Sequence, residues 1–183
     1  PPSKPSHFEV AELDKSIKDH RLDIRDGDEL KRLVSGTQPD FVFHLAAQPL
    51  LLQSYLDPVE TYQTNVLGTL NLLEALRSLK KKCTSVLITS DKCYKNVEWV
   101  WGYRETDTLG GPDPYSASKG AAELVIQSHV KSFFPTDGPV RIAIARAGNV
   151  IGGGDWAQDR VIPDCVLSWE KGDSVQLRNP HST

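Results

Sequence analysis

The chain has 183 residues, of which 39% are hydrophobic and 25% are charged, and its net charge is −3 at pH 7. This composition is ordinary for one globular domain with a buried core, and it argues against bulk disorder and against a polybasic nucleic-acid-binding protein. No apolar run approaches the roughly 18 residues that span a membrane, so we expect a soluble, cytoplasmic protein without membrane or nucleic-acid partners.

Short apolar runs and longer helical patterns alternate along the chain. The apolar runs, which are rich in β-branched or aromatic residues, predict strands at 22–24, 41–47, 86–90 and within 141–150. The helical patterns between them occupy 27–35, 59–82 and 115–134. Because strand and helix alternate, we expect an α/β fold with a doubly wound, parallel, Rossmann-like sheet.

Capping signals mark the ends of the long helices. Asp57 and Asp113 each precede a proline, so a capping side chain stands just before a proline at the first helical position. The lysines at 80–82 are interpreted as the C-terminal end of the first long helix, where cations complement the helix dipole. Both long helices therefore have predicted starts, and the first also has a predicted end.

The sequence changes character after position 150. Residues 152–156 read Gly-Gly-Gly-Asp-Trp, and a short helical pattern follows over 161–171. We therefore predict a partial dinucleotide-binding domain at 1–150, without its first strand and glycine loop, and the beginning of a smaller substrate-binding lobe at 151–183. The chain does not begin with methionine and contains none, so we expect it to be a fragment of a longer enzyme.

Cysteine and histidine spacings give no support for a metal site. Cys83, Cys93 and Cys165 are too far apart for a metal-binding Cys-x-x-Cys pair, and their odd number does not suggest a disulfide framework. The five histidines show no His-Glu-x-x-His pattern. We expect structural thiols and no metal.

Tyr115 and Lys119 form the clearest candidate catalytic pair. They lie four positions apart at the start of a predicted helix, which places them on one helical face. A lysine charge and the positive helix terminus both favour the phenolate, which suits a general base that takes a proton from an alcohol. This pattern is weak on its own, because lysine is a common residue.

The surrounding sequence supports a ligand site. The predicted strand that begins at 86 runs into polar residues as far as Asp91, at the carboxyl edge of a parallel sheet where ligands usually bind. The strand at 41–47 ends in small residues, which lets a flat ligand approach the backbone. Neither Gly-x-Gly-x-x-Gly nor Gly-x-Ser-x-Gly occurs, so a phosphate-binding glycine loop is missing and esterase chemistry is unsupported.

Several motifs, in order along the chain, carry a family resemblance. They are Asp23-Ile24, His44-Leu-Ala-Ala47, Asn65, Thr89-Ser-Asp91 and Tyr115-x-x-x-Lys119. In this order they resemble the extended short-chain dehydrogenase/reductase family of nucleotide-sugar enzymes. Finer agreement at 44–49, 89–94, 98–104, 109–111 and 146–156 resembles the 4,6-dehydratases of that family that act on CDP-sugars. Lys92 favours this group, because the dTDP-glucose group is expected to carry Glu after the Asp.

The resemblance implies a lyase with NAD as cofactor and a nucleotide sugar as substrate. CDP-glucose would become CDP-4-keto-6-deoxyglucose through oxidation at C4, loss of water across C5 and C6, and reduction at C6. Tyr115, helped by Lys119 and Ser90, would take the proton from the 4-hydroxyl, and Asp91 with Lys92 would remove water. A homodimer is also implied.

The resemblance further implies two sets of binding residues. The cofactor would contact Asp23, Ile24, Leu45, Ala46, Ala47, Gln48, Thr64, Tyr115 and Lys119. The substrate would contact Ser90, Asn149 and Arg160. The Asn149 amide and the Arg160 guanidinium suit the oxygens of a diphosphate.

Two other functions stay open at this point. A nucleotide-sugar 4-epimerase of the same fold needs Tyr115 and Lys119 but no second acid/base pair, so Asp91 and Lys92 argue against it. A non-catalytic dinucleotide-binding protein should have lost its proton-moving residues, and here they are intact.

Overall fold

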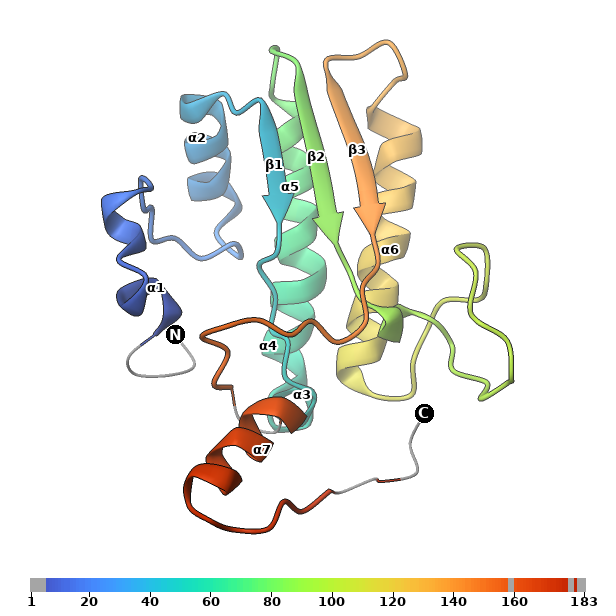
Figure 1. Cartoon of the computed structure of the whole chain (residues 1–183). Helices are drawn as coiled ribbons and strands as arrows, with labels where there is room; N and C mark the ends of the chain where they lie inside the picture. Colours follow the sequence, from blue (N-terminus) through green and yellow to red (C-terminus); the bar gives the residue numbers. More distant parts are fainter. Residues whose placement is uncertain (1–5, 158–159, 178–179, 181–183) are drawn as a thin grey trace. The chain divides into compact units, whose positions relative to one another are not determined.

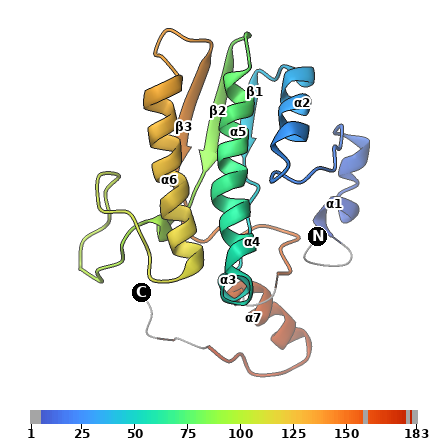
Figure 2. The same cartoon turned by 180° about the vertical axis from the view of Figure 1, so that it is seen from behind.

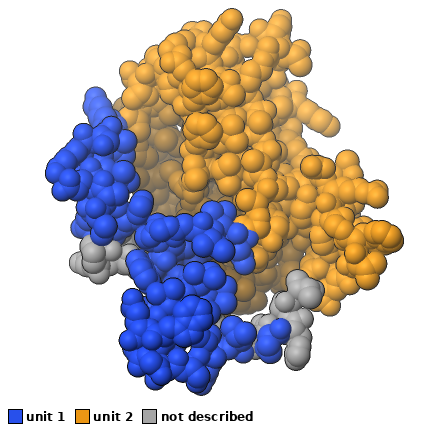
Figure 3. All heavy atoms as spheres, viewed as in Figure 1, with its two compact units in different colours: residues 1–20, 149–183 blue, residues 21–148 orange. Residues whose placement is uncertain are grey.

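A computed structural model describes residues 6–157, 160–177 and 180 of the chain. The chain divides into two compact units (Figure 3): residues 21–148 form one, and residues 1–20 together with 149–183 form the other. The larger unit contains all of the strands that the structure describes. The domain boundary predicted at position 150 stays a prediction.

A parallel three-stranded sheet forms the centre of the larger unit. Its strands are β1 (Phe41–His44), β2 (Cys83–Ile88) and β3 (Val140–Ala145), in the order β1-β2-β3. Phe43 pairs with Val86, and Leu87 pairs with Ile144. Helices α2 (Gly27–Thr37), α5 (Gly68–Arg77) and α6 (Pro114–Phe133) lie along one face of the sheet (Figures 1 and 2).

The core lies between this sheet face and the helices. Leu72 and Leu76 of α5 pack in one cluster with Leu30 of α2, and Leu87 of β2 packs in another with Ile126 of α6. Burying apolar side chains in this way is the main stabilising contribution to such a layer.

The other sheet face is largely exposed within the larger unit. The side chains of Phe41 and Phe43 on β1 are 68% and 63% exposed, and buried and less buried residues alternate along β2. The α/β class and the parallel, Rossmann-like sheet are confirmed. Among the described residues of this unit, helices cover only one face of the sheet.

The predicted helix starts are confirmed by their capping geometry. The Asp57 carboxylate accepts a hydrogen bond of 2.8 Å from the Glu60 N–H, and Asp113 accepts one of 2.8 Å from the Ser116 N–H. The first of these helices begins with α4 (Pro58–Tyr62), passes through a π-helical turn, η2 (Gln63–Leu67), and continues as α5. A short helix, α3 (Leu51–Leu56), precedes it.

Four sequence-based predictions about elements and their ends are wrong. Residues 22–24 form a loop instead of a strand, because the Ile24 carbonyl accepts from the Asn71 side chain and not from a neighbouring strand. Strands β1 and β2 end at His44 and Ile88, before the predicted 47 and 90. Helix α5 ends at Arg77, so the lysines at 80–82 follow the helix, where Lys81 pairs with Asp40 at 2.6 Å.

The described residues of the smaller unit form three short elements. These are α1 (His7–Val10), η1 (Leu13–Lys15) and α7 (Val161–Glu170). Ser6 and Glu9 form a capping box at the start of α1. Helix α7 matches the helical pattern predicted over 161–171. In the part of the chain that the structure describes, no helix is long and apolar enough to cross a membrane.

Candidate active site

Tyr115 and Lys119 lie on the inner face of α6, close to its start. Both side chains are buried, and the Lys119 Nζ lies 6.0 Å from the centroid of the Tyr115 ring. Burial lowers the pKa of Lys119, because a charged ammonium is less well solvated there than in water. The structure therefore brings the predicted phenol and ammonium together.

Glycine at position 120 lets α6 approach the segment that follows β2. A Cβ atom there would lie 3.1 Å from the Gly110 nitrogen and 3.3 Å from the Cys93 oxygen. Cys93 ends the 3-10 turn η3 (Asp91–Cys93), and α6 packs against this turn. The helix with Tyr115 and Lys119 thus lies against the turn that carries the other predicted catalytic residues.

Ser90, Asp91 and Lys92 form a tightly bonded group at this turn. The buried Ser90 hydroxyl donates to the Asp91 carboxylate at 2.9 Å and accepts from the Lys92 N–H at 3.2 Å. The Lys92 Nζ lies 3.7 Å from the Asp91 carboxylate, and both side chains are partly exposed to solvent. The two adjacent side chains come together in a 3-10 turn.

A buried ion pair holds this region together, and it was not predicted from the sequence. The Glu123 carboxylate of α6 accepts hydrogen bonds of 2.9 Å from both Arg146 Nε and Arg146 Nη2, just beyond β3. It also accepts a 2.5 Å bond from the hydroxyl of Thr89, which directly precedes Ser90. The one available signal was that Glu123 follows Lys119 by four residues, on the same helical face.

Asn65, part of the motif pattern, connects the end of β1 to α6. Its side-chain oxygen accepts from the Gln48 N–H at 2.8 Å, and its amide donates to the Gln48 carbonyl at 3.1 Å and to the Ser118 hydroxyl at 2.9 Å. The Gln48 side chain is itself bonded to Thr61 and to the Leu50 N–H. Asn65 therefore fixes the loop after β1 against α6.

His44 is a buried imidazole next to this group. Its Nε2 lies 3.1 Å from the Thr69 hydroxyl, which donates its own proton to the Asn65 carbonyl. The imidazole Nε2 must then be the donor to Thr69. Burial, together with the positive charge of Lys119, lowers the pKa of His44 to about 4, so the ring is neutral near pH 7.

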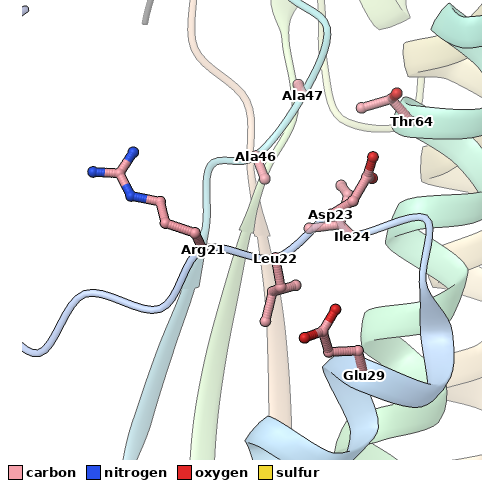
Figure 4. Close-up of a pocket in the computed structure, with 8 residues that line it drawn as sticks. All are labelled: Arg21, Leu22, Asp23, Ile24, Glu29, Ala46, Ala47 and Thr64. Carbon is pink, nitrogen blue, oxygen red and sulfur yellow. The ribbon is translucent and has the colours of Figure 1, made fainter.

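Most of the predicted cofactor residues line one pocket of about 610 Å³. Figure 4 shows that its lining comes from the loop before α2, from α2 itself, from the loop after β1 and from the π-helical turn. The lining residues are Arg21, Leu22, Asp23, Ile24, Glu29, Ala46, Ala47 and Thr64. Leu45 and Gln48, which are both described, lie outside this lining, and so do Tyr115 and Lys119, which lie on α6.

Asp23 carries a carboxylate at this pocket. Arg25 donates hydrogen bonds to it from Nε, at 2.9 Å, and from Nη2, at 2.6 Å. These bonds hold the pKa of the Asp23 carboxyl below its usual value, so the group is ionised near pH 7. A hydrogen-bond acceptor is thus present at the pocket.

The predicted substrate residues Asn149 and Arg160 belong to the smaller unit. Within that unit, the Arg160 Nε lies 3.4 Å from a carboxylate oxygen of Asp155. Their role in binding a substrate diphosphate stays a prediction.

The three cysteines are free thiols. Burial raises the pKa of Cys83, and it raises the pKa of Cys93 to about 11, which leaves both thiols protonated and unreactive near pH 7. Within the described residues, no group of three or more His, Cys, Asp or Glu side chains is placed to hold a metal ion.

Comparisons with known proteins connect this arrangement to a family. A sequence model of the GDP-mannose 4,6 dehydratase family matches residues 4–142. CDP-glucose 4,6-dehydratase of Salmonella typhimurium is 51% identical over 185 residues, which cover 99% of this chain and 52% of the relative. The chain thus spans about half the length of the curated relatives that it matches.

Solved structures share the fold. DesIV (dTDP-glucose 4,6-dehydratase) from Streptomyces venezuelae, with NAD and TYD bound, superposes with a TM-score of 0.74 at 25% identity, covering 91% of this chain and 50% of that one. RMD from Pseudomonas aeruginosa, complexed with NADPH, superposes with a TM-score of 0.69 at 31% identity, covering 85% of this chain and 51% of that one.

Proposed function

The chain belongs to the GDP-mannose 4,6-dehydratase family, and we propose that the complete protein dehydrates a nucleotide-activated hexose, with CDP-glucose as substrate and NAD as cofactor. The observation that carries this proposal is the 51% identity to a CDP-glucose 4,6-dehydratase across nearly the whole chain. The grouping of Tyr115 and Lys119 with Ser90, Asp91 and Lys92 supports it. A homodimer and a cytoplasmic location stay predictions.

The pocket in the larger unit suits the adenosine half of a dinucleotide. Its volume, about 610 Å³, falls in the range of small-molecule sites. Ala46 and Ala47 leave room for a flat ring to approach the backbone after β1. The Asp23 carboxylate can accept a hydrogen bond from an amino group, and Thr64 adds a hydroxyl.

Tyr115 is the group that would take the proton from the 4-hydroxyl of the sugar. When bound, NAD would supply a reversible hydride acceptor for the carbon that carries this hydroxyl. The Lys119 cation lies close enough to the phenol ring to stabilise negative charge that develops on its oxygen. Ser90, at the neighbouring turn, offers a hydroxyl that can hydrogen-bond to the same sugar oxygen.

Loss of water across C5 and C6 needs two further proton-handling groups. A ketone at C4 acidifies the C5 hydrogen, so one group can take that proton while another protonates the 6-hydroxyl, which leaves as water. Asp91 and Lys92 lie 3.7 Å apart, are partly exposed, and carry opposite charges. They are suited to these two roles.

The proposal is tested by the products that the complete protein forms from separate nucleotide sugars. CDP-glucose, dTDP-glucose and UDP-glucose are incubated in turn with the NAD-loaded protein, and the sugars are analysed by mass and by carbonyl content. A 4-keto product that has lost one water from CDP-glucose supports the proposal. Inversion at C4 without loss of water would indicate a 4-epimerase, and NAD binding without any product would indicate a non-catalytic binding protein.

A further inference from the structure

Three residues of one helical run face the loop that carries Asp23 and Ile24. Thr64 lies in the π-helical turn η2, and Gly68 and Asn71 follow it in α5 at spacings of four and three residues. Residues at these spacings lie on one side of a helix. Asn65, in the same helical run, bonds instead to Ser118 of α6.

Asn71 binds the backbone of the loop directly. Its side-chain amide nitrogen donates to the Ile24 carbonyl at 3.0 Å and to the Arg25 carbonyl at 3.0 Å. One amide group thereby satisfies two consecutive carbonyls that no strand takes up. The contact joins positions 47 and 46 residues apart in the sequence.

Gly68 provides the space that this contact needs. A Cβ atom at position 68 would lie 2.5 Å from Cδ1 and 2.7 Å from Cγ1 of Ile24. Only the absence of a side chain at position 68 lets the Ile24 side chain rest against the helix. Thr64, one turn earlier, lines the pocket together with Ile24.

The other bonds of the loop do not replace this attachment. Asp23 accepts from the guanidinium and the N–H of Arg25, and the Asp26 N–H donates to the Asp23 carbonyl at 2.9 Å, so these bonds shape the loop internally. An ion pair of 3.7 Å from Arg25 to Glu60 reaches α4, but it is exposed. Exposed ion pairs of this kind contribute little to stability.

We propose that Asn71 and Gly68 are positioning residues for dinucleotide binding: they hold the loop so that Asp23 and Ile24 stand at the pocket. This inference rests on the proposed function, because it takes the pocket as the site of the adenosine half of NAD. It assigns to α5 a role in cofactor affinity, distinct from the chemistry at Tyr115.

The test measures NAD affinity, turnover and loop protection in the complete protein. Asn71→Leu removes the donor at similar size, and Gly68→Ala introduces a methyl group against Ile24. Gln63→Leu is the matched control, because it removes an exposed amide from the same helical run. The readouts are the Kd for NAD by calorimetry, kcat at saturating NAD, and amide hydrogen exchange over 22–26.

Asn71→Leu and Gly68→Ala should each raise the Kd for NAD by about tenfold and speed amide hydrogen exchange over 22–26, while kcat at saturating NAD stays unchanged. Gln63→Leu should leave all three quantities unchanged. If Asn71→Leu fails to fold, the measurements on Gly68→Ala test the positioning role. Wild-type NAD affinity and exchange in a folded variant would refute the positioning role alone. Failure of the wild-type protein to bind NAD would contradict the proposed function as well as this inference.

Discussion

Replacing Glu123 by glutamine should destabilise the larger unit more than any comparable change on its surface. The Glu123 side chain is completely buried, and that of its partner Arg146 is 14% exposed. Glutamine keeps the shape and one acceptor oxygen, but it removes the negative charge. The Arg146 guanidinium would then lack a partner of opposite charge, and it would keep only one bond to the glutamine oxygen, the Glu105 carbonyl at 3.1 Å and the ring of Tyr94 at 4.7 Å.

The expected loss in free energy of unfolding is about 3 kcal/mol. Breaking a buried ion pair by removing one partner typically costs about 3–5 kcal/mol. The lower end applies here, because the glutamine oxygen can still accept one bond from Arg146. The loss would be a large fraction of the roughly 5–15 kcal/mol by which a domain is stable.

Urea denaturation of Glu123→Gln and the wild type measures this loss. With a slope of about 2 kcal/mol per molar urea, the midpoint should fall by about 1.5 M. The control is Glu74→Gln, which makes the same change in an exposed carboxylate that pairs with Arg77 and His129, and which should cost less than about 1 kcal/mol. Equal midpoint shifts for the two variants would refute the reasoning.

The contribution of Glu123 should also depend on pH with a defined sign. Burial raises the pKa of its carboxyl, but the hydrogen bonds from Arg146 and Thr89 outweigh burial and lower it overall. A folded-state pKa below the unfolded value contributes stability that is present above the unfolded pKa and is lost as the pH falls through the folded one. Glu123→Gln should remove that part of the acid dependence.

The other predictions concern catalysis and the buried imidazole. Tyr115→Phe in the complete protein should lower turnover by at least about a hundredfold while the Kd for NAD changes little, because only the proton-accepting oxygen is lost; wild-type turnover would refute the assignment. Asp91→Asn or Lys92→Ala should slow loss of water more than the first oxidation, so that reduced cofactor accumulates and absorbs in the near ultraviolet; equal slowing of both steps would favour the epimerase. Because the pKa of His44 is lowered from 6.5 to about 4, the unfolded chain takes up a proton in this interval and the folded chain does not, so stability should fall by about 3 kcal/mol as the pH drops from 6.5 to 4. His44→Gln should remove this part of the loss, and identical pH profiles of the two proteins would contradict it.

Local signals in the sequence determined a large part of the fold. Asp57 and Asp113 start their helices through bonds to N–H groups three residues later, so each cap could be recognised from the adjacent residues. The three strands and the shared face of Tyr115 and Lys119 also follow from short-range periodicity. The order of the motifs along the chain also indicated the family.

The tertiary structure decided how these pieces meet. The Glu123 carboxylate bonds to Arg146, which lies 23 residues later in the chain, and the Asn71 amide bonds to the Ile24 carbonyl, 47 residues earlier. The second bond also explains why the predicted strand at 22–24 is a loop. Asp91 and Lys92 come together because the chain turns in a 3-10 helix directly after β2. The partner of a side chain that bonds across such separations depends on which segments the packed core brings into contact. Residue spacing along the chain does not specify which segments these are.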